Sequence, residues 1–313
     1  FEFAKIDMIT LEVLDECSPL LEVILGSPES FGGIPKKDNI YDPKTLLNVK
    51  NGTFPSEEAI KKELDAFYDV LMGYDVKVHR PEVFKSVNQI FARDIGMVIG
   101  DQFLFPQILD KRSEEQIGIH FIINQIDVNK LLKVGGSARI EGGDVMPYRD
   151  YLFVGYSKKE DFDNYIVSRT NEAGVDFLIE HFKSWKIKPF ELKKSDYNPY
   201  NNALHLDCCF QPIGKNKAII YKAGFKNQSD AEWIINFFKP ENILEINQEE
   251  MYDMNSNVFS ISHEIIVSEL KFERLNQQLR DWNFIVEEIP FSETAKMEGL
   301  LRCATLPLRR SYA

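Results

Sequence analysis

Short apolar runs separated by polar turns recur along most of the chain. Polar turns between β-rich runs are typical of hairpins, so four pairs of these runs predict β-hairpins. The pairs occupy residues 95–105, 145–154, 209–221 and 258–267, and they turn near Gly100-Asp101, Arg149-Asp150, Gly214-Lys215-Asn216 and His263.

A segment with helical spacing follows each hairpin, and a brief β-rich segment follows each helix. The predicted helices are Glu114–Gln125, Asn171–Trp185, Ser229–Phe238 and Phe272–Trp282. The predicted returning strands are Val134, Pro189–Leu192, Ile243–Ile246 and Phe284–Val286.

A fifth copy opens the chain, with a strand at Leu20–Leu25, a helix from Ser56 to about Met72, and a strand at Val76–Val78. Five ββαβ-like units spaced by roughly 50 residues predict a closed repeat array with a central site. The alternative is an α+β fold without symmetry.

Residues 30–53 are rich in Gly, Pro, Asn and Lys and predict a long loop. The sequence does not determine whether this loop closes over the site as a lid.

Composition narrows the class of protein. The chain has 313 residues, 44% hydrophobic and 27% charged, which is an ordinary globular balance. Its net charge of −12 disfavours nucleic acid and anionic membranes as partners. No apolar run approaches the ~20 residues of a membrane helix, and the first residues lack the pattern of a signal peptide. Four cysteines without a CxxC pair indicate a reducing compartment, and we expect the cytoplasm.

Reactive side chains precede the first strands of several units. Asp94 precedes the first hairpin, and Glu141 precedes the second. His205 and Asp207 precede the third, and Cys303 lies in a β-rich stretch near the end. Equivalent strand ends in a ring point to one axis, so these groups are expected to converge. A cysteine attacks as thiolate with help from a histidine, whereas several carboxylates suit a planar cation, so the set indicates attack on a guanidinium carbon.

Each residue also has an ordinary structural interpretation. Cys303 alone is a small buried hydrophobe, and His205 alone is a hydrogen-bonding group of the core. Glu141-Gly142-Gly143-Asp144 alone is a turn, and Asp94 beside Arg93 is an exposed ion pair. No His or Cys pair has metal-ligand spacing, so no metal is expected.

Several stretches in this order resemble the guanidino-group-modifying enzymes of the pentein fold. The resemblance covers essentially the whole chain and is carried by residues 18–26, 91–94, 141–144, 168–171, 204–207 and 299–303. It implies an α/β propeller of five ββαβ units about a pseudo-fivefold axis. We expect an N-terminal arm over residues 1–17 and one catalytic domain over residues 18–313.

The resemblance also implies roles. Cys303 matches the nucleophile that forms a covalent thiouronium, His205 the general acid/base, and Glu141 a carboxylate supporting the histidine or the guanidinium. The substrate-binding residues implied are Asp94 and Asp207 for the guanidinium nitrogens, Asn88 for substrate binding, and Arg169 and Arg112 for the substrate carboxylate. Asp144 is implied to support its turn. No cofactor is expected, because the nucleophile comes from the protein.

The stretches that carry the resemblance point to different subfamilies. Residues 299–303 and 168–171 look like the dimethylarginine dimethylaminohydrolases, residues 141–144 and 205–207 look like arginine deiminase, and the ending resembles the amidinotransferases. Arg93 and Asp207 depart from the dimethylaminohydrolases and argue against a pocket for dimethylated guanidinium. We expect hydrolysis of arginine or a similar guanidine, with amidino transfer to an amine as the alternative and non-catalytic binding as a third reading. The expected partner is a small guanidino substrate, and the chain is expected to be a monomer or homodimer.

Overall fold

The strands form five separate three-stranded sheets with one shared topology. The computed structural model describes residues 8–312. In every sheet the middle strand pairs antiparallel with one neighbour and parallel with the other. Four sheets follow chain order: β3 (Met97–Ile99), β4 (Gln102–Phe105), β5 (Leu131–Lys133); β6 (Val145–Tyr148), β7 (Tyr151–Tyr156), β8 (Lys186–Glu191); β9 (Phe210–Ile213), β10 (Lys217–Ile220), β11 (Ile243–Glu245); β12 (Phe259–Ser260), β13 (Ile265–Glu269), β14 (Ile285–Ile289). The pentein fold of five ββαβ units is thereby confirmed.

The fifth sheet joins the two ends of the chain. It contains β15 (Thr305–Arg310), β1 (Leu20–Leu25) and β2 (Lys77–His79), in that order. Strand β15 runs antiparallel to β1, with Ile24 opposite Leu306. The last strand therefore supplies the first strand of the fifth unit and closes the ring.

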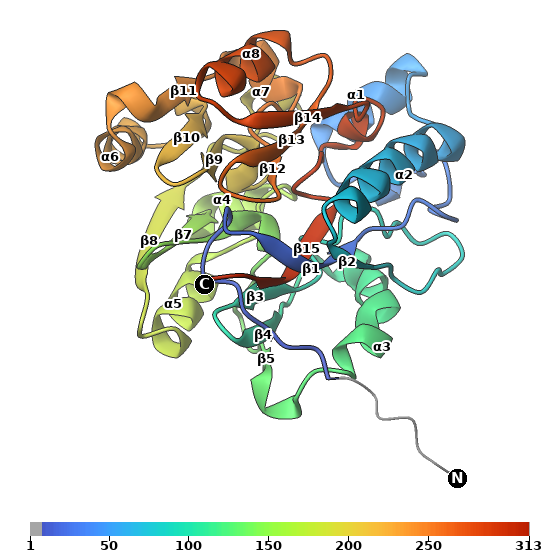
Figure 1. Ribbon diagram of the computed structural model, residues 1–313. Coiled ribbons are helices and arrows are strands. Elements are labelled where there is room, and N and C mark those ends of the chain that lie inside the picture. Colours follow the sequence, from blue (N-terminus) through green and yellow to red (C-terminus); the bar gives the residue numbers. More distant parts are fainter. Residues whose placement is uncertain (1–7, 313) are drawn as a thin grey trace.

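The longer helix of each unit lies between its second and third strands along the chain. The α-helices are α1 (Pro43–Asn51), α2 (Glu57–Gly73), α3 (His120–Ile123), α4 (Lys159–Asn164), α5 (Glu172–His181), α6 (Gln228–Phe238), α7 (Gln248–Tyr252) and α8 (Glu273–Asp281). Helices α2, α3, α5, α6 and α8 lie around the outside of the strands in Figure 1. The 3₁₀ helices are η1 (Lys37–Asn39), η2 (Asp110–Ile119), η3 (Val128–Lys130), η4 (Gly142–Asp144), η5 (Pro199–Asn201), η6 (Leu206–Cys208), η7 (Lys222–Gly224), η8 (Pro240–Asn242) and η9 (Thr294–Met297).

The four predicted hairpins are confirmed, and so are the three helices predicted in the second, third and fourth of these units. The helix predicted over 114–125 is wrong as an α-helix, because its first half belongs to the 3₁₀ helix η2 and only four residues form α3. Gly118 weakens the α-helix by about 1 kcal/mol. A 3₁₀ helix also places residues three apart in line, which pairs Arg112 with Glu115. The strand predicted at Val134 forms just before that residue, as β5 over Leu131–Lys133.

The long loop predicted over residues 30–53 is wrong in its second half, where α1 forms. Asp42 caps this helix by accepting a hydrogen bond from the backbone N–H of Thr45 at 2.6 Å, and Pro43 occupies the first turn. Gly52 ends the helix in the left-handed conformation with φ 68°. An Asp-Pro start and a glycine end are signals that the sequence carried.

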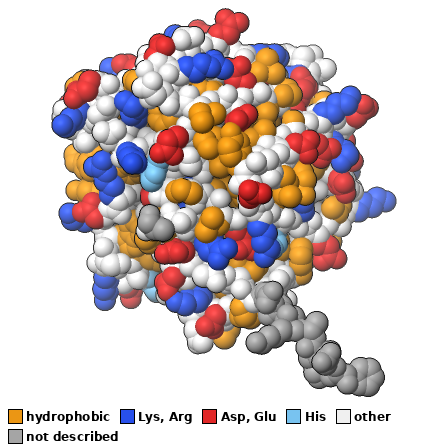
Figure 2. Space-filling model, in the orientation of Figure 1, with side chains coloured by type: hydrophobic (Ala, Val, Ile, Leu, Met, Phe, Trp, Pro, Cys, Tyr) orange, Lys and Arg blue, Asp and Glu red, His pale blue; other side chains and the backbone are white. Residues whose placement is uncertain are grey.

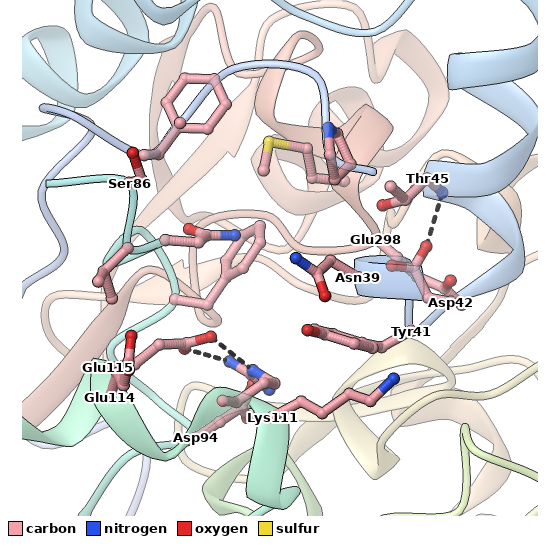
Figure 3. A pocket seen from close by; sticks show the side chains of 18 of the residues that line it. Asn39, Tyr41, Asp42, Thr45, Ser86, Asp94, Lys111, Glu114, Glu115 and Glu298 are labelled. Carbon is pink, nitrogen blue, oxygen red and sulfur yellow. Dashed lines mark hydrogen bonds and ion pairs between the residues drawn. The ribbon is translucent and has the colours of Figure 1, made fainter. Parts of the chain in front are cut away.

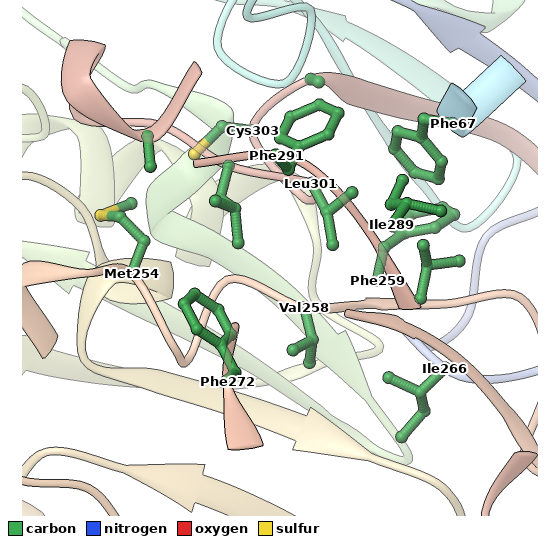
Figure 4. Packing of buried hydrophobic residues seen from close by; sticks show 14 of the residues in the cluster. Phe67, Met254, Val258, Phe259, Ile266, Phe272, Ile289, Phe291, Leu301 and Cys303 are labelled. Carbon is green, nitrogen blue, oxygen red and sulfur yellow. The ribbon is translucent and has the colours of Figure 1, made fainter. Parts of the chain in front are cut away.

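Buried apolar side chains fill the space between each sheet and its helix and continue between units. The largest cluster joins α2 and the fourth unit to the turn before β15, so Phe67, Phe259 and Phe291 pack edge to face (Figure 4). Cys303 belongs to this cluster (Figure 4). The nucleophile candidate is therefore packed against the apolar core.

Acidic and basic side chains are interspersed on the face shown in Figure 2. All four cysteines are buried and free. Among residues 8–312, no helix combines the length and the apolar character that crossing a membrane requires.

Candidate active site

A cavity of about 750 Å³ opens where the turns before several first strands meet. This volume is within the usual range for small-molecule sites. One wall comes from the segment before and at the start of α1, with Asn39, Tyr41 and Asp42; another comes from η2, with Glu114 and Glu115 (Figure 3). Six residues predicted for the site line the cavity: Asn88, Asp94, Arg112, Arg169, His205 and Cys303.

Glu141 and Asp207 do not line the cavity, although both contact residues that do. Each is fully buried. Glu141 accepts a hydrogen bond from Nε2 of His205 at 2.9 Å, and Asp207 lies 3.6 Å from the sulfur of Cys303. The structure therefore brings these two carboxylates against the reactive side chains rather than into the open space.

Glu141 is the centre of a buried charge network. Its carboxylate accepts hydrogen bonds from Arg112 and Arg169 at 3.1 Å each, and from the backbone N–H of Leu109. Burial raises the pKa of Glu141, but Arg169, Arg112 and His205 outweigh it and hold the pKa well below its usual range. These positive charges favour the carboxylate form of Glu141 beside His205.

His205 is surrounded by acidic groups. Burial lowers its pKa, but Asp94, Asp144 and Glu141 outweigh burial and raise the pKa above its ordinary value. Nδ1 lies 3.7 Å from Asp94, on the side opposite the bond to Glu141. A histidine charged in this way can give a proton to a departing amine.

Two adjacent glycines permit this packing. A Cβ on Gly143 would lie 2.7 Å from the ring of His205, and one on Gly142 would lie 2.0 Å from the carbonyl oxygen of Arg93. A larger residue at Gly143 would push the second unit away from the third, and one at Gly142 would push it away from the first. The Glu-Gly-Gly-Asp stretch is consequently a close-contact segment, and Asp144 joins the two units by accepting from the backbone N–H of Leu206 at 3.0 Å.

Cys303 lies in the turn before β15, between Asp207 and the side chain of Asn257. Burial raises the pKa of its thiol well above the ordinary value, and Asp207 and Asp94 raise it further. The thiol therefore needs a nearby positive charge or hydrogen-bond donors to form the reactive thiolate.

Both predicted carboxylate-binding arginines are already engaged. Arg112 donates to Asp94 at 3.0 Å and to both carboxylate oxygens of Glu115, in addition to Glu141. Arg169 donates to the carbonyl oxygen of Tyr41 at 2.9 Å, which ties the segment before α1 to the site. Arg112 thus places a guanidinium of the chain itself between two of the predicted site carboxylates.

Asp94, Glu141 and His205 also offer three ligand atoms within 4.8 Å of one another, a grouping that can hold a metal ion. Arg112 donates from one nitrogen to both carboxylates of this group. Its positive charge at that point opposes a metal cation.

Comparison with known proteins assigns the family. The model of the family named N,N dimethylarginine dimethylhydrolase, eukaryotic, matches residues 28–310. The chain belongs to this dimethylhydrolase family. It is therefore an enzyme of the pentein type that modifies guanidino groups.

The chain is also similar to uncharacterized protein YkgA of Bacillus subtilis (strain 168). The two are 31% identical over 225 residues, which cover 71% of this chain and 70% of the relative. Two solved structures share the fold. The N-terminal domain of ArgZ, a cyanobacterial arginine dihydrolase bound to product, has a TM-score of 0.75, 17% identity, and coverage of 93% of this chain and 98% of that one. SxtG, an amidinotransferase from Microseira wollei, has a TM-score of 0.74, 19% identity, and coverage of 97% and 98%.

Two buried residues at or near this cavity were missed by the sequence analysis. Arg302 is fully buried and bridges Asp207 at 2.8 Å to Glu16 at 3.0 and 3.1 Å. Glu298 lines the cavity next to Asp42 (Figure 3), and burial together with Asp42 raises its pKa well above the ordinary value. Their proximity to Cys303 in the sequence was a signal for both.

Proposed function

We propose that the chain hydrolyses a C–N bond of arginine or an arginine-like guanidine through a covalent thiouronium on Cys303. The observation that carries the proposal is that Cys303, His205 and Asp94 line one cavity, with Glu141 bound to His205. A buried nucleophile, an acid/base and acidic groups around one space suit a planar cation. The dimethylhydrolase family match supports hydrolysis over transfer.

The proposed reaction has two halves. The Cys303 thiolate bonds to the guanidinium carbon, and protonated His205 gives its proton to the departing nitrogen as the C–N bond breaks. A water then bonds to the thiouronium carbon while neutral His205 takes a proton from it, and the C–S bond breaks to restore the thiolate. Guanidinium and water become a urea-type product and an amine or ammonia.

Binding follows from the charges on the cavity wall. Asp94 attracts the substrate guanidinium, and the substrate takes over the contact that Arg112 now makes with it. Arg169 and the released Arg112 are proposed to hold a substrate carboxylate. Asn88, which also lines the cavity, is proposed to contact the guanidinium. The two carboxyl groups of Asp42 and Glu298 lie together at the cavity, and a positive charge beside them offsets their repulsion, so the pair suits a substrate ammonium.

Mass spectrometry of products tests the proposal. The purified chain is incubated with L-arginine and with asymmetric dimethylarginine, each with and without glycine as amine acceptor. Citrulline with ammonia or dimethylamine supports hydrolysis and identifies the leaving group. Ornithine with an amidinated acceptor would assign the chain to the transferases instead, and no turnover of any guanidine would contradict enzymatic function at this site.

Variants locate the chemistry. Cys303→Ala is expected to reduce turnover by at least about 10³-fold. His205→Ala is expected to reduce it by about 10²–10⁴-fold. Cys209→Ala is the matched control, because Cys209 is an equally buried cysteine whose sulfur contacts the carbonyl oxygen of Leu206 and which does not line the cavity. Normal turnover in Cys303→Ala would exclude the thiouronium mechanism.

A further inference from the structure

The five units contribute unequally to the centre of the ring, and one contribution has no role in the reaction described above. Reactive side chains stand just before the first strand of four units: Asp94 before β3, Glu141 before β6, His205 and Asp207 before β9, and Cys303 before β15. The equivalent position before β12, in the remaining unit, is Asn257. Its side chain is fully buried.

Asn257 contacts Cys303 twice. Its side-chain Nδ2 lies 3.2 Å from the Cys303 sulfur, and its Oδ1 accepts a hydrogen bond from the backbone N–H of Cys303 at 3.1 Å. A backbone N–H can only donate, so Oδ1 must face it and Nδ2 must face the sulfur. The orientation of the amide is therefore set by the backbone, and an N–H donor is aimed at the sulfur before substrate arrives.

The rest of Asn257 is held equally firmly. Its carbonyl oxygen accepts from the backbone N–H of Arg302 at 3.2 Å, and Nδ2 also lies 3.5 Å from the carbonyl oxygen of Asp207. Both neighbouring turns of the ring thus fix the amide. A donor held this way needs no reorganisation when charge appears on the sulfur.

We propose that Asn257 stabilises the Cys303 thiolate by donating a side-chain hydrogen bond to its sulfur. The inference rests on the proposed function, in which that thiolate attacks the guanidinium carbon. Hydrogen bonds to charged groups are stronger than those between neutral groups, and the difference grows in a buried site. Asn257 therefore favours the charged form of Cys303 over the neutral thiol.

Burial and nearby acidic groups disfavour the thiolate, so a donor aimed at the sulfur opposes them. The acidic groups facing it are Asp207 and Cys208 from η6 and Asp94 from the turn before β3. Burial and the two aspartates raise the pKa of Cys303, while a backbone hydrogen bond at Leu300 and the charge of Arg302 lower it. His205 lines the same cavity and is charged when protonated.

The pH dependence of Cys303 alkylation tests the proposal. Iodoacetamide is the probe, and the modified Cys303 peptide is quantified by mass spectrometry across a pH series. In Asn257→Ala the midpoint of the rate is expected to rise by about 1–2 pH units. In Asn257→Asp, which keeps the shape of the side chain, the midpoint is expected to rise at least as far, because a carboxylate replaces the donor.

Asn255→Ala is the matched control. Asn255 lies in the same turn and is also buried, with 3% exposure, and neither contact of Cys303 described above involves it. Its midpoint is expected to stay at the wild-type pH. An equal shift in Asn255→Ala would show that the turn, not the amide donor, governs the thiol.

Two further outcomes are decisive. Lower thermal stability of the Asn257 variants with an unchanged alkylation midpoint would overturn the proposal and leave Asn257 a structural residue. If Asn257→Ala does not fold, Asn257→Asp carries the test. Because alkylation needs no guanidine turnover, a shifted midpoint in a chain that turns over no guanidine would contradict only the proposed function.

Discussion

Glu141 is expected to control the protonation of His205, and Glu141→Gln tests this with little change in shape. The substitution removes the anion that accepts from Nε2 of His205 at 2.9 Å in a fully buried setting. A hydrogen bond to a charged group contributes about 1.5–3 kcal/mol. At about 1.36 kcal/mol per pKa unit, the pKa of His205 should fall by about 1–2 units. Asp94 and Asp144 remain and keep the fall from being larger.

The assay is an NMR titration of the His205 ring proton, assigned by its loss in His205→Asn. The high-pH limit of turnover should move to lower pH by a similar amount, because His205 donates its proton in the first half of the reaction. Glu115→Gln is the control, since Glu115 is also a buried partner of Arg112 but makes no hydrogen bond to His205. An unchanged His205 titration in Glu141→Gln would refute the reasoning.

Three other changes have expected outcomes. Arg302→Met should lower the free energy of unfolding in urea by about 3–5 kcal/mol, because it leaves the carboxylates of Glu16 and Asp207 buried without their partner. Asp42→Ala should cost about 1 kcal/mol in the same measurement, through loss of the cap of α1. Burial and Asp42 raise the pKa of Glu298 well above its ordinary value of 4.5, so its contribution to the free energy of unfolding is fully present at low pH and is lost as pH rises through the folded pKa. Glu298→Gln should therefore raise the thermal midpoint relative to wild type, more at about pH 8 than at about pH 5.

The repeat architecture was accessible from the sequence because each unit carries its own local signals. Hairpin turns such as Gly100-Asp101 and apolar periodicity are properties of neighbouring residues, and they predicted the hairpins and most helices correctly. The helix predictions were wrong where the local signals were weak or were not used. Residues 110–119 adopt a 3₁₀ helix that aligns Arg112 with Glu115, and residues 43–51 form a helix whose cap signals lay in a segment rich in loop formers.

The candidate site also has features that the sequence predicts and features that depend on tertiary packing. Cys303, His205 and Asp94 stand at comparable points of separate units, so the ring model was sufficient to expect them around one cavity, and they do line one. The same rule applied to the fourth unit would have pointed to Asn257, but an asparagine carries no reactive signal by itself. Which carboxylates face open space depends on packing: Asp94 lines the cavity, whereas Glu141 and Asp207 are sealed behind it.

The sequence by itself determined the local elements, their repetition and the set of chemical groups available, because these follow from residue type and short-range spacing. Only the tertiary structure decided the partners of each charge. Arg302 binds Glu16 from the opposite end of the chain, and β15 completes the sheet begun by β1. Arg112 of the first unit meets Arg169 and Glu141 of the second unit because these two units pack together at the centre of the ring. Such pairings join residues far apart in the chain, and burial, which sets their strength, exists only once the ring has closed.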